Sequence, residues 1–375
     1  MSRIAVIVFN TFRNDNRVFR TARYLQDQGH EVVVGALWEE GLPLKENDRG
    51  LDVRRTPIKT KGLPQGKVFG FIKFAEMYLR FIFAYRKYDV IHANDFNPFF
   101  LAIMARWITP KLKVIYDSHE FQSERYDKPG WRRRLIRATE KRYARKADAV
   151  ITVGETIASE YKRLFHIPVV HVIHNVPHRM ELQASSKLRD HFHIPNDKIV
   201  FLYQGGLVVS RGIENLLEAF VQLDTSDAVL VVMGNGNLQH LVHDASAKTD
   251  KIFYLPAVPY EDLLAYTASA DVGVVSTQNL CLNNYYCMPN KLFEYVQAGL
   301  PVLSNNLKDC GAFVTNHGIG LMAQSWEVND INKALKDFDR ENIALFKSKV
   351  PPVAARYNWE KEQEILNEIY QKVLG

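Results

Sequence analysis

The residues from 288 to 301 have the types and order needed to bind an anion. Pro289 and Asn290 favour the start of a short helix. The N-terminus of a helix presents unpaired N–H groups and a partial positive charge, which together bind phosphate. Lys291 in the first turn adds a full positive charge, and Glu294, one turn later, can accept hydrogen bonds from vicinal sugar hydroxyls. The segment therefore predicts a sugar-phosphate site, and a solvated surface helix is the alternative.

A glycine-containing loop with an arginine follows the apolar run 199–204. Gly205 and Gly206 allow the backbone to approach a ligand closely, and Arg211 can form two parallel hydrogen bonds with phosphate oxygens. Gly234, at the end of the next apolar run, begins a second glycine turn. Such turns also form for structural reasons alone. The glycine spacing matches neither the dinucleotide-binding fingerprint nor the P-loop consensus. We therefore predict that a diphosphate is bound by the glycine backbone and Arg211 rather than by either of these motifs.

The first half of the chain also places polar residues directly after apolar runs. His119 can hydrogen-bond a sugar hydroxyl or carry a proton near neutral pH, or it is an ordinary surface histidine. Asp95 is a candidate carboxylate on the acceptor side, or it caps the following helix. Asn10, Arg13 and Arg17 lie in or after the first loop, where we expect them to meet phosphates from the acceptor side.

The elements that must position these residues alternate between strand and helix patterns along the whole chain. This alternation predicts an α/β fold with two doubly wound parallel sheets, whose ligands bind at the carboxyl ends of the strands in a cleft between facing domains. We expect a first domain at residues 1–176, a polar linker to about residue 195, and a second domain at 195–350. The last helix, within 357–375, follows two prolines and is expected to pack back on the first domain.

Composition limits the class of protein. The chain has 375 residues, of which 47% are hydrophobic and 24% charged, with three irregularly spaced cysteines. This favours a globular protein of a reducing cytoplasm without a disulfide framework, and it offers no clustered ligands for a metal. The N-terminus is expected to be a first strand rather than a signal peptide. The longest apolar run, 68–85, is interrupted by Lys73, Glu76 and Arg80, so we expect no membrane-spanning helix.

Positive charge is concentrated between residues 128 and 146. This stretch holds nine Lys or Arg residues, counting Lys128, and a single acid, Glu140. A cluster of this kind favours an anionic partner. The preceding run 69–85 mixes aromatic, aliphatic and basic residues, as interfacial segments do. We therefore expect an anionic membrane surface rather than nucleic acid, with a core helix followed by a solvated basic helix as the alternative.

Nearly the whole chain resembles the retaining glycosyltransferases of family 4, which have two Rossmann-like domains in the GT-B architecture. The segments that carry the resemblance are 15–18, 116–120, 172–177, 203–212, 259–274 and 289–301. The resemblance implies transfer of a sugar from a nucleotide-sugar donor, most often UDP- or GDP-linked, to a glycan or lipid-linked acceptor, with retention and without a metal or other cofactor. It implies a role in cell-surface polysaccharide or lipopolysaccharide synthesis, at the cytoplasmic face of the membrane.

The resemblance also implies roles for individual residues. Arg211 takes the place of the lysine that holds the donor diphosphate, Glu294 matches the glutamate that binds the donor ribose, and His119 matches the histidine that contacts the transferred sugar. As the glycosidic bond breaks, Arg211, Lys291 and the helix N-terminus would stabilise the leaving group.

Two positions depart from the family pattern. Tyr286 stands at the position of the first glutamate of the family's E-x7-E motif, in which Glu294 is the second. Gly206 stands where the family usually has an arginine that binds phosphate. The departures indicate either a subgroup in which residues 289–291 rebuild the phosphate contacts, or a subunit without activity that binds a partner transferase. A nucleotide-sugar 2-epimerase on the same architecture is a further alternative, although it needs more carboxylates than Asp95, Asp117 and Glu120 provide.

Overall fold

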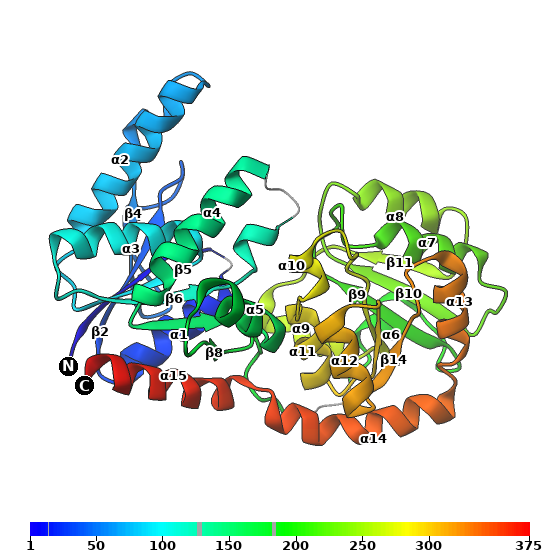
Figure 1. Cartoon of the computed structure of the whole chain (residues 1–375). Coiled ribbons are helices and arrows are strands. Elements are labelled where there is room, and N and C mark those ends of the chain that lie inside the picture. Colours follow the sequence, from blue (N-terminus) through cyan, green and yellow to red (C-terminus); the bar gives the residue numbers. More distant parts are fainter. Residues whose placement is uncertain (14, 126–129, 182–184) are drawn as a thin grey trace. The chain divides into compact units, whose positions relative to one another are not determined.

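The computed structural model describes residues 1–13, 15–125, 130–181 and 185–375 (Figure 1). The chain divides into two compact units. The first contains Met1–Ile173 together with Gln363–Gly375, and the second contains His174–Glu362. The last helix, α15 (Trp359–Leu374), therefore contributes its larger part to the first unit. Lys128, which the charge analysis counts, lies outside the described residues.

The first unit is built on one sheet with the strand order β3-β4-β2-β1-β5-β6-β7-β8. All neighbouring strands pair in parallel except the hairpin of β3 with β4. The strands are β1 (Arg3–Ile7), β2 (Glu31–Leu37), β3 (Lys45–Asp48), β4 (Leu51–Thr56), β5 (Val90–Asn94), β6 (Lys113–Ser118), β7 (Ala149–Thr152) and β8 (His171–Val172). The longer helices are α1 (Asn16–Asp27), α2 (Lys67–Tyr85), α3 (Phe96–Ile108), α4 (Gly130–Tyr143) and α5 (Glu155–Phe165).

The C-terminal helix completes the first unit. Leu366, Ile369 and Val373 of α15 are buried. The hydroxyl of Tyr370 lies 3.0 Å from Nδ1 of His92 on β5, and the two rings stack. The end of the chain is thus fixed to a central strand of the first sheet by apolar packing and a buried hydrogen bond.

The second unit has a parallel sheet with the order β11-β10-β9-β12-β13-β14. Its strands are β9 (Ile199–Gln204), β10 (Ala228–Met233), β11 (Ile252–Leu255), β12 (Val272–Val275), β13 (Val302–Ser304) and β14 (Gly320–Met322). Its helices are α6 (Lys187–Phe192), α7 (Ile213–Gln222), α8 (Gln239–Ser246), α9 (Tyr260–Thr267), α10 (Leu282–Tyr285), α11 (Asn290–Gln297), α12 (Lys308–His317), α13 (Val328–Lys336) and α14 (Arg340–Arg356). Both sheets are doubly wound, which confirms the predicted fold class.

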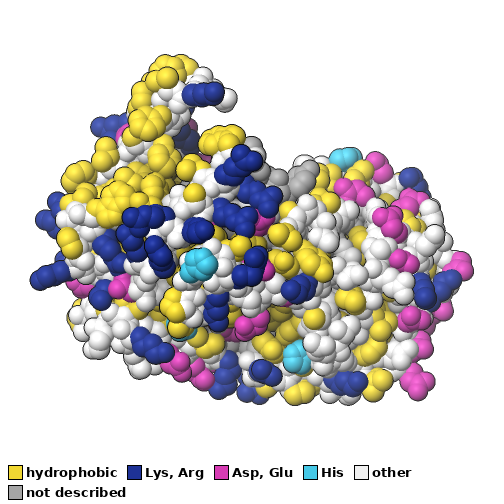
Figure 2. All heavy atoms as spheres, in the orientation of Figure 1, with side chains coloured by type: hydrophobic (Ala, Val, Ile, Leu, Met, Phe, Trp, Pro, Cys, Tyr) yellow, Lys and Arg dark blue, Asp and Glu magenta, His cyan; other side chains and the backbone are white. Residues whose placement is uncertain are grey.

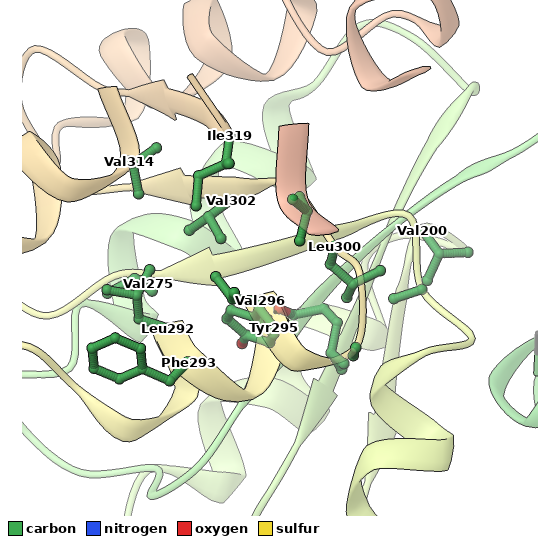
Figure 3. Close-up of a cluster of buried hydrophobic side chains, with 14 of the residues drawn as sticks. Val200, Val275, Leu292, Phe293, Tyr295, Val296, Leu300, Val302, Val314 and Ile319 are labelled. Carbon is green, nitrogen blue, oxygen red and sulfur yellow. Dashed lines mark hydrogen bonds between the residues drawn. The ribbon is translucent and has the colours of Figure 1, made fainter. Parts of the chain in front are cut away.

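Helix α11 is the best anchored helix near the predicted anion site. Leu292, Phe293 and Val296 pack into one of the two apolar clusters of the second unit (Figure 3). The hydroxyl of Tyr295 donates toward the carbonyls of Leu202 (3.0 Å) and Val274 (3.2 Å) and accepts from the backbone N–H of Gln204 (3.1 Å). This packing fixes the first turn of α11 against the ends of β9 and β12.

Some elements differ from the sequence predictions. Helix α6 lies inside the segment predicted to be a polar linker, with Leu188 buried. Helix α14, which the sequence analysis did not predict, continues through Pro351 and Pro352. Two prolines remove backbone hydrogen bonds but do not end this helix, because Val350 and Val353 on either side of them are buried in the core.

Candidate functional site

A buried cation lies at the ends of β9 and β12 in the second unit. Lys291, in the first turn of α11, is only 8% exposed, and its Nζ lies 3.6 Å from the centre of the Tyr203 ring. Within the described residues this ammonium has no hydrogen-bond acceptor. Burial and the charge of Arg211 hold the pKa of Lys291 well below its usual range, although Glu294 opposes them. An unpaired buried ammonium is costly, and an anion bound beside it would supply the missing charge and hydrogen-bond acceptors.

The glycine loop after β9 packs against the loop after β10. Gly205 has a positive φ of 125°, and a Cβ there would lie 3.3 Å from Nζ of Lys291. A Cβ on Gly234 would lie 1.9 Å from the carbonyl oxygen of Gly205. The two loops are joined by backbone hydrogen bonds from Gly205 to Met233 and from Leu207 to Asn235. Close packing of two loops therefore explains Gly234 without a ligand, whereas Gly205 borders the buried cation.

Arg211 is placed by a loop that is held on both sides. Ser276 donates a hydrogen bond to the carbonyl of Arg211 (2.5 Å), and the N–H of Gln278 donates to the carbonyl of Ser210 (2.9 Å). Ser210 has a positive φ of 79°, which is uncommon for a residue other than glycine. Strain of this kind persists only where neighbours hold it, and it is frequent at functional sites. The carbonyl of Gly206 accepts from the hydroxyl of Tyr203 (2.8 Å).

Glu294 is held by a short polar chain that the sequence did not reveal. Its carboxylate accepts from Nε2 of Gln204 (2.5 Å), whose Oε1 accepts from the hydroxyl of Thr267 (2.8 Å). Gln204 and Thr267 are buried. The one signal for Gln204 is its position as a polar residue at the end of an apolar strand. The exposed Asn290 accepts from the side chain of Asn175 (2.8 Å).

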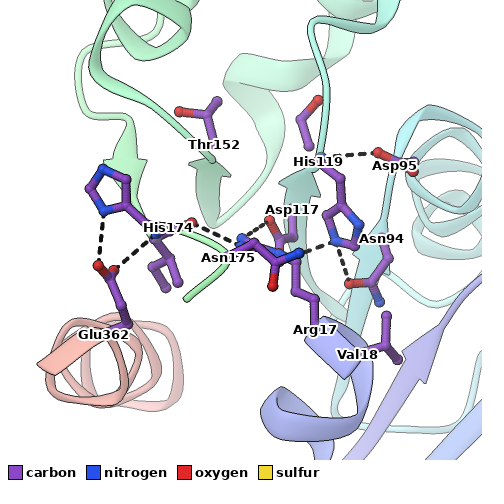
Figure 4. A network of polar contacts seen from close by, with 12 residues as sticks. Arg17, Val18, Asn94, Asp95, Asp117, His119, Thr152, His174, Asn175 and Glu362 are labelled. Carbon is purple, nitrogen blue, oxygen red and sulfur yellow. Dashed lines mark hydrogen bonds and ion pairs between the residues drawn. The ribbon is translucent and has the colours of Figure 1, made fainter. Parts of the chain in front are cut away.

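In the first unit a buried ion pair lies under the end of β6 (Figure 4). Arg17 donates to both carboxylate oxygens of Asp117, from Nε at 3.1 Å and from Nη2 at 2.7 Å, and its Nη1 donates to the carbonyl of Ile173. Burial alone would raise the pKa of Asp117, but the charges of Arg17 and His119 hold it well below its usual range. The guanidinium of Arg17 therefore positions Asp117 within the protein.

His119 lies beside this pair (Figure 4). Its Nε2 is 3.1 Å from Oδ1 of Asn94 and 3.6 Å from Oδ2 of Asp117. Burial lowers the pKa of His119, but Asp95 and Asp117 outweigh it, so the pKa lies above its ordinary value. Asp95 accepts from the backbone N–H of His119 (3.0 Å) and from Gln122 (2.7 Å), and makes no side-chain cap to α3. Its φ of 69° is a second strained position at a strand end.

The loop after β1 contains the two remaining candidates. Asn10 donates to Asp15 (2.8 Å) and accepts from the N–H of Phe12 (2.8 Å). Asp15 in turn caps α1 by accepting from the N–H of Val18. Asn10 thus shapes the loop, and Arg13 is exposed on it.

A buried glutamate near His119 was not predicted. Glu140 on α4 accepts hydrogen bonds from the hydroxyls of Tyr116 and Tyr161, each at 2.7 Å. Tyr161 also lies 2.8 Å from the hydroxyl of Ser118 at the end of β6. Burial raises the pKa of Glu140 to about 7, although the two tyrosines oppose this. The sequence showed Glu140 only as the single acid in a basic stretch.

The two halves of the chain match two different protein-family models. Residues 15–176 match the model of Glycosyltransferase Family 4, and residues 185–346 match that of Glycosyl transferases group 1. The chain is similar to the lipopolysaccharide 1,2-N-acetylglucosaminetransferase of Salmonella typhimurium, with 31% identity over 191 residues, 46% of this chain and 48% of that protein. The alignment thus spans about half the length of this curated relative.

Solved structures share the fold of the whole chain. Sucrose-phosphate synthase from Thermosynechococcus elongatus superimposes with a TM-score of 0.79 at 17% identity, covering 100% of this chain and 99% of that one. Anabaena HepE in complex with UDP has a TM-score of 0.76 at 13% identity, covering 99% and 100%. The chain thus consists of two glycosyltransferase-family domains, one of Glycosyltransferase Family 4 and one of Glycosyl transferases group 1, in the GT-B fold.

Proposed function

We propose that the chain transfers a sugar, with retention, from a UDP- or GDP-linked donor to a glycan or lipid-linked acceptor. The observation that carries the proposal is the buried ammonium of Lys291, which has no acceptor within the described residues. It lies in the first turn of α11, whose N-cap Pro289 makes no side-chain cap. A diphosphate supplies the negative charge and the hydrogen-bond acceptors that this arrangement needs.

The proposed mechanism follows from the charge that develops during transfer. When the anomeric C–O bond breaks, negative charge grows on the leaving diphosphate. Lys291, the N–H groups of α11 and Arg211 stabilise it electrostatically. Glu294, held by Gln204, accepts hydrogen bonds from the vicinal hydroxyls of the donor ribose. Retention is attributed to attack on the same face of the sugar that the diphosphate leaves, with the departing phosphate oxygen accepting the acceptor's proton.

The first unit is assigned the acceptor and the transferred sugar. We assign His119 to a hydroxyl of that sugar, with Asp95 and Asn94 fixing its loop and ring. Asn10 and Arg13 are assigned to the acceptor side. Arg17 is assigned a positioning role, since its guanidinium is bound to Asp117 and Ile173.

The comparisons support the class of donor and acceptor. The Salmonella relative is named for transfer of N-acetylglucosamine to lipopolysaccharide, and HepE is described in complex with UDP. On this basis we propose a role in the synthesis of lipopolysaccharide or another cell-surface polysaccharide, at the cytoplasmic side of the membrane. No metal or other cofactor is proposed for the reaction.

The test is a thermal-shift panel of UDP, GDP, dTDP, ADP, CMP and their sugar conjugates without added metal. A donor that binds only the folded protein raises its melting temperature. We expect a shift with one base, a much smaller shift in Lys291→Met because its binding is weaker, and an unchanged shift in the control Lys333→Met, an exposed lysine of α13. Transfer by the wild type, with the anomeric configuration of the product read by NMR, then tests retention.

A panel without any shift would overturn the proposal. It would favour a subunit without activity that binds a partner transferase, to which the departures at Tyr286 and Gly206 already point. Sugar inversion at C2 in the absence of any acceptor would instead indicate an epimerase.

A further inference from the structure

Helix α2 carries an unusual amount of exposed apolar surface. Its buried residues are Tyr78, Phe81, Ile82 and Tyr85, all in its C-terminal half. In its N-terminal half, Val68 is 70% exposed and Phe71 is 71% exposed. Figure 1 shows this half extending beyond the sheet of its own unit. A soluble protein rarely leaves such a contiguous apolar surface uncovered unless the surface binds something.

Four of the exposed apolar residues of α2 form a stripe, while Phe71 and Phe74 continue the line of the buried face toward the N-terminal end of the helix. Val68, Ile72, Leu79 and Phe83 are all exposed, and their spacing of four, seven and four residues places them on one side of the helix. At about 100° per residue this stripe lies roughly 120° around the helix from the buried face. The helix therefore has two apolar faces: its own unit covers the C-terminal half of one of them and leaves the other exposed.

Helix α4 presents positive charge in the same unit. Ile136 and Glu140 are its buried residues, four apart, so the helix contacts the protein along one narrow line. Arg134 and Lys141 fall on the opposite side and are exposed, and the exposed Arg145 follows in the short 3-10 turn Ala144–Lys146 after the helix. Beside them are two exposed apolar side chains, Trp131 (64%) and Leu135 (58%).

Helix α3 connects these two helices. The ring of Tyr78 on α2 lies 5.9 Å from that of Phe100 on α3, which lies 6.5 Å from that of Tyr143 at the end of α4. Trp107, exposed at the end of α3, packs against Tyr143 at 5.8 Å. Figure 2 shows hydrophobic side chains over α2 next to a field of Lys and Arg side chains. We call the exposed residues of α2 and α4, together with Arg145 directly after α4, the α2–α4 surface.

We propose that the α2–α4 surface binds the headgroup region of an anionic phospholipid bilayer. The stripe of α2 enters the boundary between headgroups and acyl chains, Trp131 and Leu135 anchor α4 at the same depth, and the α4 cations contact lipid phosphates. Among the described residues no helix is long and apolar enough to cross a bilayer. This inference does not depend on the sugar-transfer reaction.

A lipid surface fits these residues better than nucleic acid. Nucleic acid would satisfy the α4 cations, but its charged backbone would leave Val68, Ile72 and Leu79 in water or against phosphate. A bilayer covers both groups, because its phosphates lie directly above its hydrocarbon. Charge complementarity on α4 combined with apolar surface on α2 therefore selects the anionic bilayer.

The test is sedimentation of the full-length protein with vesicles of equal parts phosphatidylglycerol and phosphatidylcholine. We expect binding at low salt, weaker binding at physiological salt because exposed charges are screened, and little binding to pure phosphatidylcholine. The triple variant Arg134→Glu, Lys141→Glu, Arg145→Glu should lower the affinity on the order of a hundredfold. The triple variant Val68→Ser, Ile72→Ser, Leu79→Ser should lose the binding that remains at physiological salt.

Matched controls change the same residue types outside the α2–α4 surface. For charge the control is Lys248→Glu, Lys333→Glu, Lys349→Glu, and for apolar exposure it is Leu44→Ser, Val169→Ser, Leu345→Ser. Both controls should bind vesicles like the wild type, and circular dichroism should show all four variants folded.

Three outcomes would overturn the proposal. These are absence of vesicle binding at low salt, equal losses in the control variants, and preferential binding of random duplex DNA that is lost in the α4 charge variant. The last outcome would identify the surface as a nucleic-acid site.

Discussion

At the scale of single residues, Lys291 shows how an unfavourable buried charge in the free protein can strengthen the binding of an anion. Its ammonium is removed from water and lies beside the positive charge of Arg211, which together keep its pKa well below the usual range. A bound diphosphate would reverse both effects by supplying negative charge and acceptors. The unfavourable free energy of burying this lysine in the free protein is thus removed when the ligand binds, and this strengthens binding.

This argument predicts that nucleotide diphosphate binding takes up protons. Because the pKa of Lys291 is depressed in the free protein and raised in the complex, affinity should fall as pH rises between these two values. Isothermal titration calorimetry in buffers of different ionisation enthalpy measures the uptake directly. The variant Lys291→Met should bind with little pH dependence over the same range, whereas uptake unchanged by this substitution would contradict the assignment.

Sequence reasoning proposed the charged residues of the second unit as site residues but did not find the groups that hold them. Lys291, Arg211 and Glu294 could be predicted because helix starts and glycine loops have local signatures. The hydrogen bonds by which Gln204 and Thr267 hold Glu294 could not be predicted, because they join three elements that are far apart in the chain. For the same reason the sequence presented Arg17 as a ligand-binding residue, whereas its partner Asp117 lies one hundred positions away.

At the scale of elements, α4 combines an outward basic face with a buried carboxylate. The pKa of Glu140 is raised from 4.5 to about 7 by burial. Between these values the folded protein holds a proton that the unfolded chain has released, so the stability of the first unit falls as pH rises from about 4.5 to 7. Above about pH 7 the folded protein carries the full free-energy cost of burying the ionised Glu140 carboxylate.

The variant Glu140→Gln should remove this pH dependence. Its free energy of unfolding at pH 8 should exceed that of the wild type by up to about 3 kcal/mol, offset by weaker hydrogen bonds from Tyr116 and Tyr161. Chemical denaturation at a series of pH values measures both curves. Parallel curves for variant and wild type between pH 4.5 and 7 would show that Glu140 is not the titrating group.

A pair of glycine substitutions tests the packing of the loops after β9 and β10. Gly234→Ala should destabilise the second unit by about 2 kcal/mol or more, because φ is 152° and the new Cβ would overlap the carbonyl of Gly205. Gly70→Ala, in α2, meets nothing within 4 Å and should stabilise its helix slightly. Urea denaturation of both variants provides the comparison, and equal effects would refute the packing argument.

The strand and helix alternation made most elements predictable, but helices α6 and α14 were not predicted, for the same physical reason. Helix α6 is short and polar, and α14 contains Pro351 and Pro352. Local propensity argues against both helices. They form because Leu188 in the first case and Val350 and Val353 in the second are buried against distant residues, and no local pattern reports such contacts.

At the scale of the whole molecule, the chain is divided so that its two ends belong to one unit. Residues from Gln363 onward complete the first unit, where Leu366, Ile369 and Val373 are buried and Tyr370 reaches His92. The second unit is continuous from His174 to Glu362. The stability of the first unit therefore depends on the last turns of α15.

Deletion of residues 363–375 should destabilise the first unit selectively. It uncovers the apolar surface beneath α15 and leaves His92 without the Tyr370 hydroxyl. Scanning calorimetry should show the transition of the first unit at lower temperature, with that of the second unit little changed. The milder Tyr370→Phe should cost about 1 kcal/mol, and a deletion without effect on the first transition would contradict this dependence.

The divided first unit also determines the order in which a newly made chain can finish folding. Synthesis proceeds from the N-terminus, and domains generally complete in that order. Here residues 363–375, which close the first unit, are synthesised after the whole of the second unit. The first unit, whose strands are made first, is therefore completed only after the second unit has been synthesised, and until then the apolar surface that α15 covers stays exposed.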